Sequence, residues 1–137
     1  MKIIITENQL HEIIKSSDVY DDVDSVKSIA DGRRNVAFIG LKHISIKSRV
    51  LISKIVGENN LKVLYVGGDD NYVVYRQGSE SEANELKKIA EKYDGYLSYK
   101  ATDDEERRIG QILSYDPEDT ERHIRNKKER MKQQDLQ

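Results

Sequence analysis

The sequence predicts an α+β fold in which helices flank a small mixed β-sheet. Short β-branched runs alternate with segments whose apolar residues recur every three or four positions, which is typical of strands alternating with amphipathic helices. A length of 137 residues suits one domain with one hydrophobic core. We expect a single domain over 1–133, with an N-terminal strand and helices (1–32), a sheet core (35–100), a C-terminal helical hairpin (102–133) and a frayed tail (134–137).

The N-terminal part is predicted to contain one strand and two helices. Residues 2–5, KIII, are mostly β-branched and predict a short strand. Thr6 and Gln9 form a capping box that opens the first helix. Gly32 is expected to end the second helix. The apolar residues that predict this second helix are Val23, Val26, Ile29 and Ala30.

The sheet core begins with NVAFIGL, residues 35–41, which predicts a central strand covered on both faces. A helix over 44–57 follows, with Val50 among its inward-facing residues and its last glycine as the stop signal. A right-handed crossover to a strand at 61–66 would make these two strands a parallel pair. The Gly-Gly-Asp-Asp turn then leads to an antiparallel strand at 71–76. We expect the helices to lie mainly on one face of this sheet.

The next helix is predicted from a second capping box, formed by Ser79 and Glu82, and is expected to end at Gly95. GYLSYK, residues 95–100, predicts a short edge strand. The order strand, helix, strand, strand, helix resembles the β-α-β-β-α core of ferredoxin-like folds, which implies that arrangement for the sheet core.

The C-terminal helical hairpin is predicted from two start signals. Thr102 and Glu105 form a third capping box. Asp116 caps the last helix and Pro117 takes its first position. Acidic residues lead this last helix and basic residues close it, which complements the helix dipole. We expect the hairpin to pack at an edge of the sheet.

The stretch VLYVGGDDNYVVYR, residues 63–76, resembles the hairpin of palm-type nucleotidyl transferases, a group that includes diguanylate cyclases and the polymerase-like subunit of type III CRISPR complexes. The resemblance implies that Asp69 and Asp70 would bind metal and that Gly67 and Gly68 would let a nucleotide approach. Two-metal chemistry needs a further carboxylate from another element, and the preceding NVAFIGLKHIS contains none. We therefore interpret the stretch as a tight hairpin and predict no catalytic residue, metal ligand or cofactor.

A phosphorylated small ligand is one predicted partner. Lys42 and His43 follow the first core strand, at the edge where open sheets usually bind ligands, and Ser45 lies near the start of the next helix. The alternative is a solvated loop. The full set of candidate ligand-binding residues is Lys42, His43, Ser45, Asp69, Asp70 and Arg76.

The last helix is the second candidate surface, because its few apolar residues could be buried by a partner protein. The candidate partner-binding residues are Ile124, Arg125, Lys128 and Met131. The basic stretch RNKKERMK could instead contact nucleic acid. We consider nucleic acid unlikely as a partner, because the acids that begin this helix would face phosphate in a helix-turn-helix complex.

The absence of cysteine excludes disulfides and zinc–thiolate sites. No apolar run reaches the ~20 residues of a membrane helix, and MKIIITENQL becomes polar too early for a signal peptide, so we expect a cytoplasmic protein. MKIIITENQL and DGYLSYKATDDEERRIGQILSYDPEDTERHI resemble stretches of small accessory proteins of tailed bacteriophages.

The phage resemblance implies a non-enzymatic binding protein in the host cytoplasm. It would bind a host protein or sequester a phosphorylated small ligand, as in counter-defence, and it could form a homo-oligomer. Two alternatives stay open. One is a degenerate palm-like domain for nucleotide binding or nucleotidyl transfer. The other is nucleic-acid binding through the C-terminal basic helix.

Overall fold

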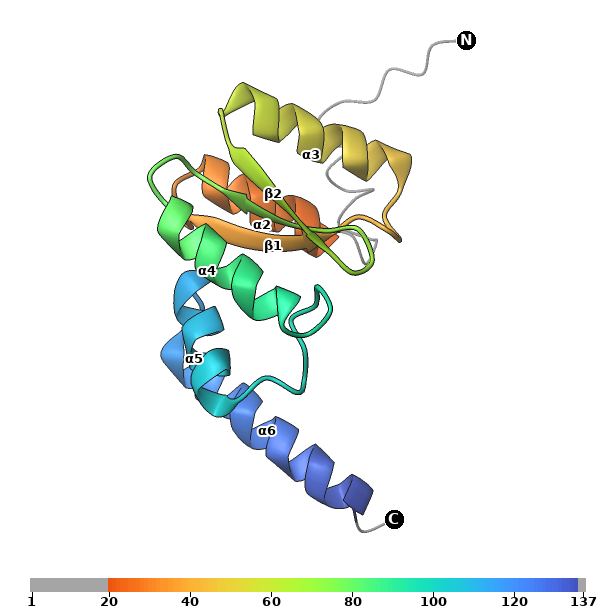
Figure 1. The fold of residues 1–137 in the computed structure, drawn as a ribbon. Helices are drawn as coiled ribbons and strands as arrows, with labels where there is room; N and C mark the ends of the chain where they lie inside the picture. The colour runs from red at the N-terminus through yellow and green to blue at the C-terminus, as the bar shows by residue number, and fades with distance from the viewer. Residues whose placement is uncertain (1–19, 136–137) are drawn as a thin grey trace.

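The computed structural model describes residues 20–135, so the predicted strand at 2–5 and the capping box of Thr6 and Gln9 lie outside the described residues. None of the helices in the described range combines the length and apolar character needed to cross a bilayer. The elements, in chain order, are α2 (Tyr20–Ala30), β1 (Val36–Gly40), α3 (Ile46–Glu58), β2 (Lys62–Gly67), β3 (Asn71–Tyr75), α4 (Glu80–Glu91), α5 (Asp103–Ile112) and α6 (Pro117–Asp135) (Figure 1).

The α+β class is confirmed, but the sheet is antiparallel throughout instead of mixed. Its strand order is β1-β3-β2, and β3 pairs antiparallel with both neighbours. The predicted parallel pair is therefore wrong: β1 and β2 run in the same direction, but β3 lies between them. β1 is an edge strand, not the central one. Val73 and Val74 of β3 point to opposite faces of the sheet and are both 0% exposed. The strand that is apolar on both faces is therefore the central strand.

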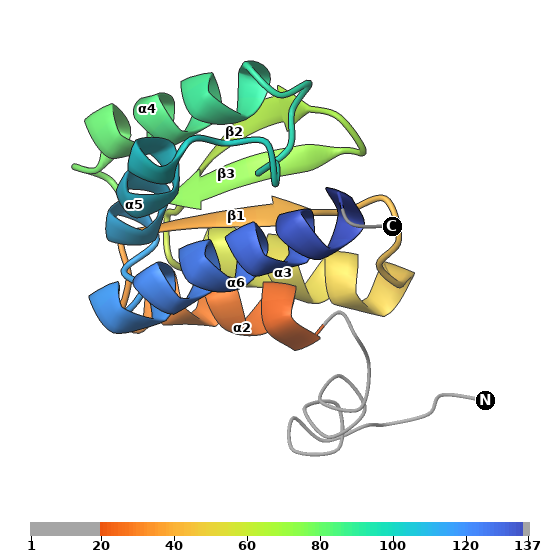
Figure 2. The ribbon, with the colours of Figure 1, turned by 90° about the horizontal axis from the view of Figure 1, so that it is seen from below.

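Helices cover both faces of the sheet, which corrects the expectation of one face. Ala37 and Ile39 of β1 pack with α2 and α3, while Val36 of the same strand packs with α4 and α5. Figures 1 and 2 show the sheet between α2 and α3 on one side and α4 on the other. This placement differs from a ferredoxin-like core, whose helices are segregated to one face of the sheet.

The two cores have separate side chains. The core under α2 and α3 contains Val23, Val26, Ile29, Ala37, Ile39, Ile52, Ile55, Leu61 and Val74. The core under α4 and α5 contains Val36, Val66, Val73, Tyr75, Ala83, Leu86, Ala90, Ile109, Ile112 and Leu113.

Several predicted helix signals are confirmed. Thr102 accepts a hydrogen bond from the backbone N–H of Glu105, whose carboxylate accepts one in return from the Thr102 N–H. Asp116 accepts a hydrogen bond from the backbone N–H of Glu118 at 2.8 Å, so it caps α6 as expected. Gly32 follows the end of α2 with a φ of +80°, which is the conformation of a C-terminal cap.

Other predicted signals are wrong. The Ser79 side chain makes no capping hydrogen bond to α4, and the neighbouring Glu80 carboxylate accepts hydrogen bonds from the Gly78 N–H. α3 continues past Gly57 to Glu58. Val50 is 61% exposed instead of buried.

Two C-terminal boundaries also differ from the prediction. Residues 95–100 form turns and no strand. α6 continues to Asp135, through the first part of the predicted tail.

The C-terminal hairpin of α5 and α6 is present and stacks below α4, away from most of the sheet (Figure 1). The helices are antiparallel, since Gly110 of α5 lies against Thr120 while Asp103 pairs with Lys128. A Cβ added to Gly110 would lie 2.5 Å from Thr120 Oγ1, so the glycine allows the two backbones to approach closely.

The β2–β3 turn is docked against the end of α4. The Asn71 side chain donates a hydrogen bond of 2.8 Å to the carbonyl of Gly95, and both groups are buried. Gly95 has a φ of +94°, and a Cβ there would lie 2.5 Å from the backbone nitrogen of Gly68. Gly95 therefore has two roles. It ends the turn that follows α4, and its lack of a side chain lets the β2–β3 turn pack against it.

We predict that Gly95→Ala destabilises the protein more than Gly78→Ala. Gly78 has a similar φ of +102° but nothing within 4 Å of the added Cβ. Both changes cost about 1–2 kcal/mol for the left-handed backbone, and Gly95→Ala adds about 1–3 kcal/mol for the clash. Urea denaturation of the two variants measures the difference. Equal free energies of unfolding would contradict the proposed docking of the turn.

Candidate functional site

The Gly-Gly-Asp-Asp turn lies beside the segment that follows β1. Asp69 accepts a hydrogen bond of 2.9 Å from the Lys42 ammonium. Hydrogen bonds from the Tyr96 hydroxyl and from Lys42 lower the pKa of Asp69. The Asp69 carboxylate therefore links the β2–β3 turn to Lys42, after β1, and to Tyr96, after α4.

Asp70 has different partners from Asp69. It accepts a hydrogen bond of 2.8 Å from the Tyr72 hydroxyl, which raises the pKa of Tyr72, and it lies 3.7 Å from the Arg49 guanidinium. Arg49 also donates to the Leu41 carbonyl. Among residues 20–135, no group of three or more His, Asp or Glu side chains is arranged to hold a metal ion. Asp69 and Asp70 thus lie beside two different cations, Lys42 and Arg49.

Most of the other candidate ligand residues lie near this turn. Ser45 caps α3 by accepting a hydrogen bond from the Ser48 N–H, and His43 is exposed in the loop between β1 and α3. Arg76 does not lie with the other candidate residues. It follows the opposite end of β3, roughly 16 Å away at 3.3 Å per residue, and donates to the Ile29 carbonyl at the end of α2.

A groove runs along α6, and we call it the α6 groove. It has a volume of about 700 Å³, within the range of ligand and peptide sites. α5 and residues 97–99 form its other walls. The lining residues are Leu97, Ser98, Tyr99, Glu106, Ile109, Gly110, Leu113, Tyr115, Asp119, Thr120, His123, Lys127, Arg130, Met131 and Gln134.

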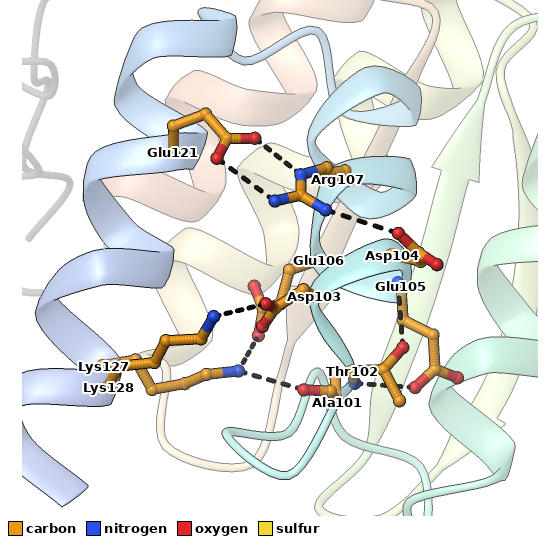
Figure 3. Close-up of polar contacts among 10 residues, drawn as sticks. All are labelled: Ala101, Thr102, Asp103, Asp104, Glu105, Glu106, Arg107, Glu121, Lys127 and Lys128. Carbon is orange, nitrogen blue, oxygen red and sulfur yellow. Dashed lines mark hydrogen bonds and ion pairs between the residues drawn. The ribbon is translucent and has the colours of Figure 1, made fainter. Parts of the chain in front are cut away.

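A buried ion pair lines the groove and connects its three walls. The Lys127 ammonium lies 3.1 Å from Glu106 Oε1 and donates a hydrogen bond of 3.0 Å to the Ala101 carbonyl (Figure 3). The side chains of Lys127 and Glu106 are only 10% and 11% exposed. His123 Nε2 lies 3.3 Å from the second oxygen of Glu106. One cation therefore ties α6 to α5 and to the loop that precedes α5.

Exposed ion pairs reinforce the contact between α5 and α6. Arg107 and Glu121 are 2.6 Å apart, as are Lys128 and Asp103, and Figure 3 shows both bridges. Lys128 lowers the pKa of Asp103, and Arg107 lowers that of Glu121. Because these side chains are exposed to solvent, each pair contributes little to stability.

The rim of the groove is apolar and exposed. Tyr99 is 66% exposed, Tyr115 48% and Met131 45%. The Arg34 guanidinium lies 5.5 Å from the centre of the Tyr115 ring, which holds that ring beside the loop after α2. Exposed apolar groups gathered around a hollow are typical of an interaction site.

Only some of the four predicted partner-binding residues are exposed and free to contact a partner. Ile124 is 2% exposed, so the expectation that a partner buries it is wrong. Lys128 is engaged with Asp103, whereas Arg125 is exposed on the outer side of α6. Met131 alone of the four lines the α6 groove.

Sequence reasoning missed Tyr99, Tyr115 and Arg130. Tyr99 lies in the segment that was predicted to be an edge strand, so its side chain was assigned to sheet packing. Arg130 is exposed and forms no ion pair with the part of the chain that the structure describes. The signal that could have indicated this site is a pair of tyrosines that flank the first helix of the predicted hairpin.

No protein-family model matches this chain, and comparisons with curated proteins and with solved structures found no match.

The entrance to α5 is held by Glu105, which fixes the loop that forms one wall of the groove. Its carboxylate accepts hydrogen bonds from the Thr102 N–H and the Tyr93 hydroxyl, and Lys92 lies 3.2 Å away. In that order of importance, these contacts lower the pKa of Glu105 from 4.5 to about 2.

We predict that Glu105→Gln reduces stability at neutral pH and flattens its acid dependence. The pKa of Glu105 is lowered by folding, so its contribution is complete above pH 4.5, decreases below that and is absent below about pH 2. Solvent screening limits the loss at pH 7 to on the order of 1–2 kcal/mol. Urea denaturation from pH 7 to pH 2 measures it. Parallel stability profiles for the wild type and Glu105→Gln would refute the assignment.

Proposed function

We propose that the chain is a non-enzymatic binding protein whose α6 groove receives an apolar, acid-bearing segment of a partner protein. The observation that carries this proposal is the gathering of Tyr99, Tyr115 and Met131 around a hollow of about 700 Å³. Tyrosine and methionine are residues that interfaces favour, because they offer large apolar area and adapt to the bound surface.

The length of the groove favours a peptide segment over a small molecule. Its α6 wall extends from Asp119 to Gln134, which corresponds to roughly 22 Å at 1.5 Å per residue. That length equals about four turns of a bound helix, or six to seven extended residues. A small ligand would contact only part of this wall.

The charges of the groove favour an acidic group on the partner. Lys127 and His123 face the two oxygens of Glu106, so this buried carboxylate is already compensated. Asp119 lies 3.2 Å from Arg122. Arg130 is then the cation available to a ligand. An acid beside an apolar side chain on the partner would pair with Arg130, which would improve specificity and the rate of association.

The resemblance to phage accessory proteins supports a host protein as the partner, met in the host cytoplasm. Blocking such a protein by occupying its exposed segment needs no reaction, and this agrees with a groove whose buried polar groups form intramolecular pairs. Interference with a host defence is the biological role that we propose.

A phosphorylated small ligand near Lys42, His43 and Ser45 is the second candidate. One observation favours it: the first turn of α3, which Ser45 caps, contains no acidic residue and is followed by Arg49. An anion could accept hydrogen bonds from the free N–H groups of this turn.

The test is affinity capture from a bacterial lysate with the tagged wild type, Tyr99→Glu and Val50→Glu. Val50 is a matched control because it is 61% exposed on α3, outside the groove. We expect Tyr99→Glu to reduce capture of the specific partner at least tenfold, since a desolvated carboxylate would face an apolar surface. Val50→Glu should retain the partner. Thermal unfolding of both variants shows whether they fold.

The same set of proteins distinguishes the alternatives. Capture that Tyr99→Glu and Val50→Glu reduce equally, or that neither reduces, would contradict the groove as the binding site. Thermal stabilisation by nucleotides that disappears in Lys42→Ala would favour the second candidate instead.

A further inference from the structure

β1 and β2 are the two edge strands of the described sheet, and β2 is the one with exposed large apolar side chains. β2 is the last strand in the order β1-β3-β2, and no strand within residues 20–135 pairs with its outer edge. On the face of β2 that points away from α4, Val63 is 45% exposed and Tyr65 is 59% exposed. An edge strand with unpaired backbone groups and exposed apolar side chains is a template for pairing with another strand.

β2 has few of the features that protect edge strands from pairing. Lys62 is its only charged residue, and it contains no proline. The pairing with β3 is irregular between Tyr65 and Gly67, so the regular part of the strand begins at Lys62 and includes Tyr65. A regular stretch of this length can form only a short contact with another strand.

We propose that β2 pairs antiparallel with β2 of a second copy of this chain, with the twofold axis at Leu64. In this register Val63 lies opposite Tyr65 of the second copy, and Tyr65 opposite its Val63. All four exposed side chains then lie on one face, as aromatic and β-branched cross-strand pairs. The same surface serves both copies, as in most homodimers.

Charge and burial select this orientation and register. Parallel pairing would place the two Lys62 side chains next to each other, whereas antiparallel pairing directs each one toward the acidic turn after β2 of the other copy. An axis at Val63 would place Tyr65 opposite Leu61, which is already 8% exposed within its own core. A net charge of −2 for each copy gives little mutual repulsion.

This surface is separate from the α6 groove. α4 lies between β2 and the C-terminal hairpin in Figure 1. The dimer and the proposed binding function can therefore be tested independently.

The first test is the molar mass of the wild type and Tyr65→Lys, measured by light scattering during size-exclusion chromatography over a series of concentrations. We expect a dimer for the wild type and a monomer for Tyr65→Lys, because each introduced ammonium would replace the apolar contact with Val63 of the other copy, and the two ammoniums would lie diagonally across the β2–β2 contact. Tyr65 is exposed, so the variant should fold, and circular dichroism checks this. A wild type that is monomeric at every concentration, or a dimeric Tyr65→Lys, overturns the proposal.

The second test uses the absence of cysteine from the natural chain, which makes introduced thiols clean probes. Oxidation of a mixture of Val63→Cys and Tyr65→Cys should give a crosslinked dimer, because residues directly opposite each other lie ~4.5–5.5 Å apart at Cα, within disulfide range. Val63→Cys alone should crosslink at least tenfold less, since its own copy lies diagonally across, at ~7–8 Å.

Arg125→Cys is the control, because Arg125 is exposed on α6. In Figure 1, α4 lies between β2 and the hairpin that contains α6. Arg125→Cys should give no crosslinked dimer under oxidation. Equal crosslinking by Val63→Cys alone and by the mixture, or by Arg125→Cys and the mixture, overturns the register at Leu64.

Discussion

The buried pair of Lys127 and Glu106 is the interaction on which the candidate site depends. α6 is mostly polar, and Ile124 is its one buried apolar residue in the described range. Burying one such side chain contributes only about 1.5–3 kcal/mol. The Lys127 ammonium adds contacts with Glu106 and with the Ala101 carbonyl, and removing one partner of a buried pair typically costs about 3–5 kcal/mol. Loss of either partner alone is therefore expected to loosen α6, and with it the groove, at least as much as loss of the Ile124 contact.

The sheet determines where this pair can form. β3 is buried on both faces, so it requires helices on both sides, and α4 and α5 form the second core. The capping box of Thr102 sets the first turn of α5, which places Glu106 on the side that α6 covers. Glu105, in the same turn, faces α4 through Tyr93. Glu105 thus contacts Tyr93, just after α4, whereas the adjacent Glu106 contacts Lys127 of α6. Together the two glutamates fix α5 between α4 and α6.

Local signals in the sequence predicted local structure well. The caps at Thr102 and Asp116 are correct because they depend on residues within three positions of each other. The strand order was wrong because it depends on which strand gains most from burial on two sides, and that involves the whole sheet. Residues 95–100 alternate like a strand but form turns, and the Gly95 carbonyl accepts a hydrogen bond from the Asn71 side chain. Ile124 was assigned to a partner because its burial depends on how α6 packs against the rest of the fold. The groove is a product of these long-range contacts, so only Met131 among its apolar rim was predicted.

The most direct test of this account is amide hydrogen exchange in Lys127→Met, compared with the wild type and with Glu106→Leu/Lys127→Met. If the buried pair holds α6, amides in the middle of α6 should exchange at least a hundredfold faster in Lys127→Met, which leaves Glu106 buried without its ammonium partner. Amides of β3 should remain the slowest. The double variant should recover much of the protection, because it removes both charges. Wild-type exchange rates throughout α6 in Lys127→Met would contradict the account.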